Sequence, residues 1–143
     1  MSQVKCVQFT PETEAGIHLV RHTVFTAEQN VDAEIDFDGL DSQAVHAIVM
    51  QENQVVATGR MLEDGHIGRI AVLAEYRGLK LGAKIVNALI NEATNLAYPR
   101  VYLGSQIHAV GFYQKLGFTP FGDQYVEANI EHQSMEKLLA TNH

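Results

Sequence analysis

One segment of the sequence has the composition of an anion-binding turn at the start of a helix: Arg77-Gly78-Leu79-Lys80-Leu81-Gly82-Ala83. Small residues at such a place allow backbone N–H groups to converge on an anion, and the helix dipole adds a favourable potential. The segment lacks the Gly-Lys-Ser/Thr of a Walker loop and the G-x-G-x-x-G of a dinucleotide loop. A helix that begins with glycines for packing alone is the competing interpretation.

Carboxylates gather between Arg21 and Arg60, a stretch without lysine or arginine. Its acidic residues are Glu28, Asp32, Glu34, Asp36, Asp38, Asp41 and Glu52. Clustered carboxylates raise one another's pKa, so the stretch could cradle a cationic amine and supply a general base. A solvated acidic loop is the alternative. A calcium loop beginning at Glu34 is disfavoured, because its twelfth position falls on Val45 rather than on a glutamate.

The histidines give a weak case for a metal site. His18 and His22 stand four residues apart, a spacing that can hold zinc on a helix. No H-E-x-x-H glutamate lies between them and Cys6 is the single cysteine, so we expect no metal cofactor. His132 lies just before the last predicted strand, and it either lines a substrate pocket or simply ends a strand.

Composition limits the classes of function. A chain of 143 residues with 46% hydrophobic and 19% charged residues predicts one globular domain, residues 1–143. The net charge of −7 argues against nucleic acid and anionic membranes, which both need a basic face. The N-terminus lacks the apolar region of a signal peptide, and no apolar run approaches ~18 residues. We therefore expect a cytoplasmic protein with no nucleic-acid or membrane partner.

Hydrophobic periodicity and end signals predict the elements that must position these residues. Thr10 and Pro11 start a helix that runs to about Ala27, and Gly117 closes a short helix as a left-handed cap. The predicted helices are 11–27, 81–97 and 109–116, and the predicted strands are 44–50, 55–62, 67–73, 101–103, 118–121 and 133–139. This order predicts an α+β, or layered α/β, fold.

The element order, with Ile70-Ala71-Val72 leading into residues 77–83, resembles the GNAT superfamily of acyl-CoA-dependent N-acetyltransferases. That family holds the coenzyme A pyrophosphate with Q/R-x-x-G-x-G/A. Arg77, Gly82 and Ala83 match this motif, and Lys80 stands where the first glycine is usual. A second segment, 109–118, resembles A-x-x-F-Y-x-x-x-G-F. The opening third of the chain looks like the bacterial ElaA-like subgroup.

The resemblance implies a GNAT-like, mixed and mostly antiparallel central sheet with helices on both faces. It implies acetyl-CoA as co-substrate and a small-molecule amine or a lysine-bearing molecule as acceptor, and the edge strands near the C-terminus allow a homodimer. The residues that it assigns to the coenzyme are Ile70, Ala71, Val72, Arg77, Gly78, Leu79, Lys80, Leu81, Gly82, Ala83, Gln106, Phe112 and Tyr113.

Tyr113 matches the family's usual general acid, which protonates the departing thiolate. A tyrosine hydroxyl has a reference pKa of ~10 and stays protonated at neutral pH; plain packing beside Phe112 is the alternative role. On the acceptor side we expect Arg21, Glu28, Glu34, Asp36 and His132, with Glu28 as the candidate general base. A non-catalytic acyl-CoA-binding module with the same fold is the alternative function, and Lys80 is the feature that favours it.

Overall fold

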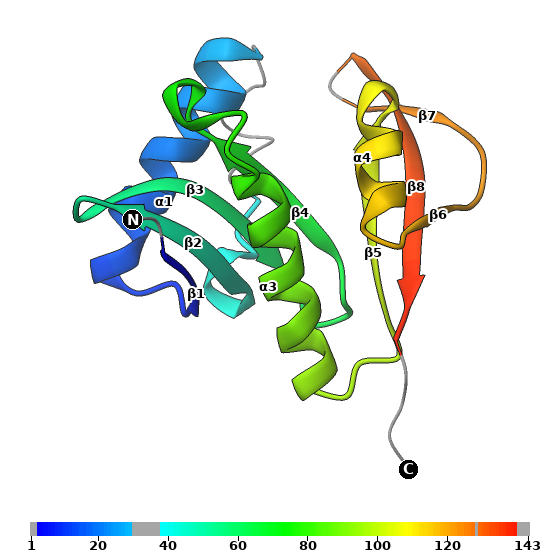
Figure 1. Cartoon of the computed structure of the whole chain (residues 1–143), viewed down its shortest axis with the longest axis horizontal. Helices are drawn as coiled ribbons and strands as arrows, with labels where there is room; N and C mark the ends of the chain where they lie inside the picture. The colour runs from blue at the N-terminus through cyan, green and yellow to red at the C-terminus, as the bar shows by residue number, and fades with distance from the viewer. Residues whose placement is uncertain (1–2, 30–37, 128, 140–143) are drawn as a thin grey trace.

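Antiparallel sheets form the frame of the computed structural model, which describes residues 3–29, 38–127 and 129–139 (Figure 1). One sheet has the order β1-β2-β3-β4, with bounds Gln3–Val7, Val45–Gln51, Gln54–Met61 and Ile67–Val72. The other has the order β5-β8-β6 with β7 also paired to β8, and its bounds are Arg100–Gln106, Ile130–Leu138, Thr119–Pro120 and Tyr125–Glu127. The predicted α+β class is confirmed.

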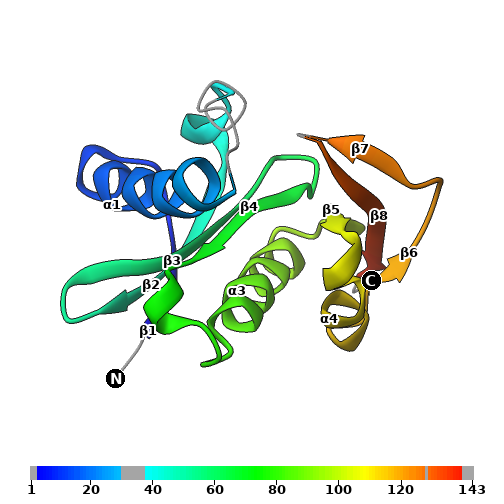
Figure 2. The same ribbon diagram turned by 90° about the horizontal axis from the view of Figure 1, so that it is seen from above.

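The helices cover both faces of the first sheet. Figure 2 shows α1 (Pro11–Arg21) on one face and α3 (Leu81–Asn95) on the other, while α4 (Val110–Lys115) packs beside the second sheet. Shorter helical turns are η1 (His22–Glu28), η2 (Asp41–Gln43), η3 (Ala74–Tyr76) and η4 (Ile107–Ala109). The hydrophobic core lies between the first sheet and α3 and continues to Val101, Leu103 and Phe118 beside the second sheet.

The first helix begins as predicted but ends differently. The Thr10 backbone N–H donates to Thr13 Oγ1 at 3.0 Å, and Pro11 takes the first helical position, where its missing N–H costs nothing. The α-helical part stops at Arg21, and the chain continues as the π-helical turn η1. There the Gln29 N–H bonds the Val24 carbonyl at 3.2 Å. This wider turn carries Phe25 and Gln29 to the wall of a cavity.

The two sheets meet at one end and separate at the other. A single parallel bridge joins His66 to Tyr102, and the Tyr102 N–H donates to the Gly65 carbonyl at 3.0 Å. Beyond this bridge β4 and β5 share no ladder in the described chain. Their facing edges therefore leave backbone groups and side chains available to a molecule placed between them.

The C-terminal strands differ from the prediction in a way that affects the site. The last strand begins at Ile130 rather than at Gln133, so His132 lies inside β8 instead of before it. The short strand β7 was not predicted from the sequence. Residues 130–132 join β8 because they pair with β5 and β7. Backbone hydrogen bonds make this pairing and do not depend on apolar side chains.

Candidate active site

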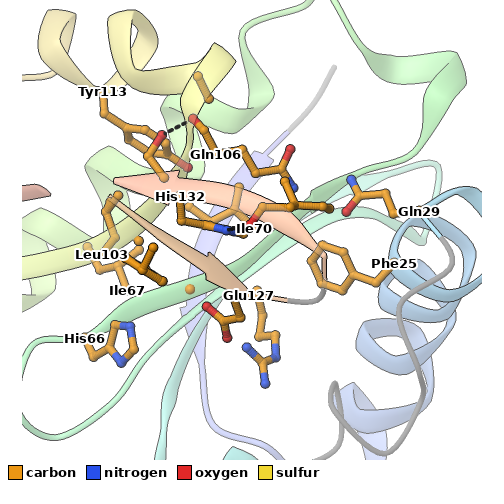
Figure 3. A pocket seen from close by; sticks show the side chains of 17 residues that line it. Phe25, Gln29, His66, Ile67, Ile70, Leu103, Gln106, Tyr113, Glu127 and His132 are labelled. Atoms are coloured by element: carbon orange, nitrogen blue, oxygen red, sulfur yellow. Dashed lines mark hydrogen bonds between the residues drawn. The ribbon is translucent and has the colours of Figure 1, made fainter. Parts of the chain in front are cut away.

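A cavity of about 340 Å³ opens where β4 and β5 separate (Figure 3). Residues from η1, β4, β5, α4 and the β7–β8 hairpin line it. They include Phe25, Ile70, Gln106, Tyr113, Glu127 and His132. The cavity therefore brings together side chains that lie up to about a hundred positions apart in the sequence, and four of them, Ile70, Gln106, Tyr113 and His132, were predicted as site residues.

A β-bulge shapes the β4 wall of this cavity. The β3–β4 register places Thr58 opposite Ala71 and Arg60 opposite Gly68, so Arg69 and Ile70 together face Gly59. Arg69 has the positive φ of 55°, typical of a distorted strand. The bulge interrupts the ladder beside Ile70, a residue of the cavity wall, and frees backbone groups there from pairing with β3. Such groups can hydrogen-bond an extended ligand arm or polarise a carbonyl oxygen.

Tyr113 reaches the cavity from α4. Burial raises the pKa of Tyr113 to about 12, so the hydroxyl keeps its proton throughout the neutral range. Its ring packs edge-on against Phe112 at 4.9 Å and Phe118 at 5.9 Å between centroids. No hydrogen bond to this hydroxyl is made by the residues that the structure describes, which leaves the proton available to a ligand.

The segment 77–83 forms the turn before α3. Gly78 and Lys80 both adopt positive φ, 82° and 64°, and Lys80 is the N-cap residue of the helix. No side chain among the described residues caps this helix end, and the first intrahelical bond runs from the Lys84 N–H to the Lys80 carbonyl. The N–H groups of Leu81, Gly82 and Ala83 therefore precede the hydrogen-bonded part of the helix, as anion binding requires.

The β7–β8 hairpin supplies the wall opposite β4. His132 pairs with Gln106 of β5 and with Tyr125 of β7, so the three side chains share one face of the sheet. The Tyr125 hydroxyl lies over Gly104, where an added Cβ would come within 2.0 Å of it. Glycine at position 104 is therefore required for Tyr125 to close over this face.

A family model of the acetyltransferase (GNAT) domain matches residues 10–139. The chain belongs to the GNAT acetyltransferase family. The uncharacterized protein YyaT of Bacillus subtilis is 37% identical over 139 residues, which cover 91% of this chain and 94% of YyaT. Protein ElaA of Escherichia coli is 32% identical over 126 residues, 82% of each chain. Both the GNAT and the ElaA resemblance predicted from the sequence are confirmed.

Solved structures agree with this assignment. The crystal structure of Escherichia coli ElaA has a TM-score of 0.87 and covers 96% of this chain and 99% of its own, at 28% identity. The crystal structure of an acyl-CoA N-acyltransferase from Pseudomonas aeruginosa has a TM-score of 0.85 at 26% identity. The match covers 94% of this chain and 99% of the Pseudomonas chain. The GNAT fold uses acyl-CoA as co-substrate, so family membership supports acyl-CoA-dependent N-acyltransferase activity in general.

Glu28 does not line the cavity of this GNAT chain. Its carboxylate accepts two bonds from Arg77 Nη2, at 2.5 and 3.1 Å, while Arg77 Nε donates to the Val72 carbonyl at 3.0 Å. Arg77 thus ties the end of β4 and η1 to the segment 77–83. The base role predicted for Glu28 is not supported by this position, because the pairing occupies the carboxylate that would have to accept the proton.

Arg21 is fully buried and bonds Asp41 at 2.7 Å, which places it in the interior and away from the cavity. The predicted substrate-binding role of Arg21 is therefore not supported. Arg60 bonds the same carboxylate at 3.0 Å and also bonds Asp38 at 2.5 and 2.8 Å, and Arg69 bonds Asp38 at 3.2 Å.

This network changes the interpretation of the acidic stretch. The hydrogen bond from Arg60 holds the pKa of Asp38 well below its usual range. Burial raises the pKa of Asp41, but bonds from Arg21 and Arg60 outweigh it and lower the pKa overall. These two carboxylates neutralise buried arginines and are not free for an amine substrate. Glu34 and Asp36, also predicted for the acceptor side, lie outside the described residues.

The remaining residues predicted for the coenzyme lie on β4, around the start of α3 and on α4. Ala71 is buried and Val72 pairs with Ala57 at the end of β4. Phe112 is 40% exposed, and its ring would stand 3.6 Å from a Cβ at Gly82. The cavity wall also contains residues that were not predicted from the sequence: Phe25, Gln29, Gly104, Tyr125 and Glu127. No local sequence signal marks a residue that folding brings beside a distant element.

Metal and membrane features are absent from the part of the chain that the structure describes. No three His, Cys, Asp or Glu side chains come together there as metal ligands. No helix among residues 3–29, 38–127 and 129–139 is long and apolar enough to cross a membrane.

Lys80 gives a first prediction about the turn before α3. Its left-handed conformation costs an L-residue about 1–2 kcal/mol, and glycine adopts it freely. Lys80→Gly should therefore raise the free energy of unfolding by about 1 kcal/mol, measured by urea denaturation. It should keep acetyl-CoA affinity within about tenfold, because backbone N–H groups carry most of the pyrophosphate recognition. Lys80→Ala is the matched control, since it removes the same charge and gains no stability. Equal stability of the Gly and Ala variants would contradict the strained turn.

Proposed function

We propose that this protein transfers an acetyl group from acetyl-CoA to a primary amine by direct attack within a ternary complex. The observation that carries the proposal is the cavity at the β4–β5 separation, where the bulge at Ile70 and the Tyr113 hydroxyl face the same space. A thioester placed there would meet backbone donors at its carbonyl oxygen and a proton donor at its sulfur. The proposal takes residues 1–143 as a single acetyltransferase domain.

The coenzyme would lie along two elements that the sequence motif joins. Its pantetheine arm would bond the exposed edge of β4 at Ile70, Ala71 and Val72, as an added strand would. Its pyrophosphate would accept the N–H groups at the start of α3, around Gly82. A positive φ at both Gly78 and Lys80 supports this role, because it directs successive N–H groups toward one concave side of the turn.

In the transfer step, the neutral amine nitrogen attacks the thioester carbon, the carbonyl electron pair moves to oxygen, and the nitrogen gives up a proton to a base. The pair returns as the C–S bond breaks, and the thiolate takes the proton from Tyr113. Stabilising the oxyanion with preorganised backbone donors is worth a few kcal/mol in comparable sites. The raised pKa of Tyr113 keeps the acid in its protonated form until sulfur becomes charged.

The non-catalytic acyl-CoA-binding module is the second candidate, and Lys80 was the residue that favoured it. The structure weakens that argument, because Lys80 adopts the left-handed conformation for which glycine is the usual residue. The turn therefore keeps its shape with lysine in place. An amine or lysine-bearing acceptor, a homodimer and a cytoplasmic location stay predictions from the sequence.

A two-part experiment tests the proposed function. Acetyl-CoA should stabilise the protein against thermal unfolding, by ~2.7 kcal/mol at a hundredfold excess over its dissociation constant, and adenine nucleotides alone should do so weakly. Coenzyme A release should then be measured with polyamines, amino sugars, aminoglycosides and lysine peptides. A melting shift with release on at least one amine supports the enzyme. A shift with no release on any amine supports the binding module, and no shift at millimolar acetyl-CoA contradicts both.

A further inference from the structure

The protonation state of one ring nitrogen of His132 follows from its contacts. Nδ1 lies 2.7 Å from the backbone carbonyl oxygen of Ile130. A carbonyl has no hydrogen to donate, so Nδ1 must carry the hydrogen of this bond. In the neutral imidazole the other nitrogen, Nε2, is then an unprotonated acceptor. His132 lines the cavity, so the sheet presents a proton acceptor to the same space that contains the Tyr113 hydroxyl (Figure 3).

We propose that His132 is the general base that removes the proton from the acceptor amine, with Nε2 as the accepting atom. This inference rests on the proposed acetyl transfer and assigns the step for which the sequence suggested Glu28. The geometry suits a base, because the Ile130 carbonyl fixes the tautomer and the Tyr125 ring stacks on the imidazole. Their centroids are 5.5 Å apart and their planes lie within 20°.

The strand register places His132 level with the end of β5. His132 opposite Gln106 is the last β5–β8 pair, and Gln106 leads through η4 into α4, which carries Tyr113. Glu127, the carboxylate in the same wall, pairs with Ile130 and so lies beyond the end of β5. His132 is therefore level with the end of the strand that leads toward Tyr113, whereas Glu127 lies further along the β7–β8 hairpin.

The other titratable groups around the cavity do not fit this role as well. Those that share the cavity wall with His132 are Tyr125 and Glu127 on β7, His66 just before β4, Arg69 on β4, and Tyr113 on α4. His66 stacks on Tyr102 at 4.7 Å, at the closed end where β4 and β5 are bridged. Arg69 is a permanent cation that cannot accept a proton, and it pairs with Asp38 at 3.2 Å. Both tyrosines hold their protons, because burial raises their pKa values.

The proton transfers balance across the complete reaction. The N–C bond forms as the amine nitrogen loses its proton to His132 Nε2, directly or through one water. The C–S bond breaks as sulfur takes the proton of Tyr113. The imidazolium then returns its proton to the tyrosinate through the cavity water, so amine and acetyl-CoA give amide and free thiol with both side chains restored.

The test compares His132→Asn with the wild type on the best amine of the panel. The asparagine amide can still donate to the Ile130 carbonyl but offers no basic nitrogen to the cavity. We expect kcat to fall on the order of a hundredfold or more, with the acetyl-CoA dissociation constant unchanged. His22→Gln is the matched control, since His22 is an exposed histidine outside the cavity wall, and it should keep the wild-type rate.

A pH profile separates a base from a packing residue. The wild-type kcat/KM should fall toward acid as the base takes up a proton, and His132→Asn should lose that acid limb. The ionisation of the acceptor amine affects the wild type and the variant equally. The difference between their two pH profiles therefore reports the ionisation of a group on the enzyme. A wild-type rate in His132→Asn, or a limb that vanishes in Glu28→Gln and persists in His132→Asn, would overturn the assignment.

Nitrogen-15 NMR of the imidazole tests the same inference without turnover. The neutral imidazole of His132 in the free protein should be protonated on Nδ1 and unprotonated on Nε2. The opposite tautomer would overturn the assignment even if the enzyme is active. If the wild type acetylates no amine, the proposed function fails and the base role fails with it, whereas an active enzyme with a fully active His132→Asn refutes the base role alone.

Discussion

Tyr113→Phe is expected to lower kcat on the order of a hundredfold or more while leaving the acetyl-CoA dissociation constant nearly unchanged. The hydroxyl matters when charge develops on sulfur, so its loss removes stabilisation of the transition state rather than of the bound ground state. Single-turnover rates at saturating acetyl-CoA, together with titration calorimetry, separate the two effects.

Tyr113→Phe should remove the hydroxyl without disturbing the fold. The described residues make no hydrogen bond to the Tyr113 hydroxyl, so its removal leaves no buried partner unsatisfied and the variant should unfold at the wild-type temperature. Tyr98→Phe removes a hydroxyl from a tyrosine that packs on the core outside the cavity, and it should keep the wild-type rate. A drop in affinity with kcat intact would make Tyr113 a packing residue, and His108 on η4 would be the next proton donor to test.

Gly82→Val is expected to weaken acetyl-CoA binding by about a hundredfold or more, equivalent to roughly 2.7 kcal/mol. The branched side chain would stand at the start of α3, where the pyrophosphate needs close approach to backbone N–H groups, and each lost charge-assisted hydrogen bond costs about 1.5–3 kcal/mol. Titration calorimetry with acetyl-CoA measures the change directly.

Gly82→Ala is the matched control for this substitution. A Cβ at position 82 would meet Phe112 Cζ at 3.6 Å, an ordinary contact, so the alanine variant should fold normally and bind within about tenfold of the wild type. The helix should also tolerate valine, so unfolding temperatures must be compared before the affinities are interpreted. Equal affinity of the wild type and a folded Gly82→Val protein would refute the assignment of residues 77–83 to the pyrophosphate.

The sequence by itself determined the elements and the motifs that local physics controls. Thr10 and Pro11 start α1, apolar segments with several valine and isoleucine residues form β2 to β4, and Gly117 ends the helix of Tyr113 with a φ of 96°. Each of these depends on residues within a few positions of one another, because capping, turn geometry and strand propensity act over short stretches of chain. Both GNAT-like motifs, residues 77–83 and 109–118, are also short local segments, so the family could be predicted from the sequence.

Only the tertiary structure decided which side chains share a space. Arg21 turns inward to Asp41, and Glu28 pairs with Arg77, 49 positions further along the chain. From sequence alone, a charged residue is predicted to be exposed or functional. Its ion-pair partner lies on another element, so nothing near it in the sequence indicates that it is buried or paired. His132 depended on register as well, because shifting a strand by one residue moves each side chain to the opposite face. Pairing with Gln106 and Tyr125 put its imidazole in the cavity wall, and no pattern near position 132 contains that information.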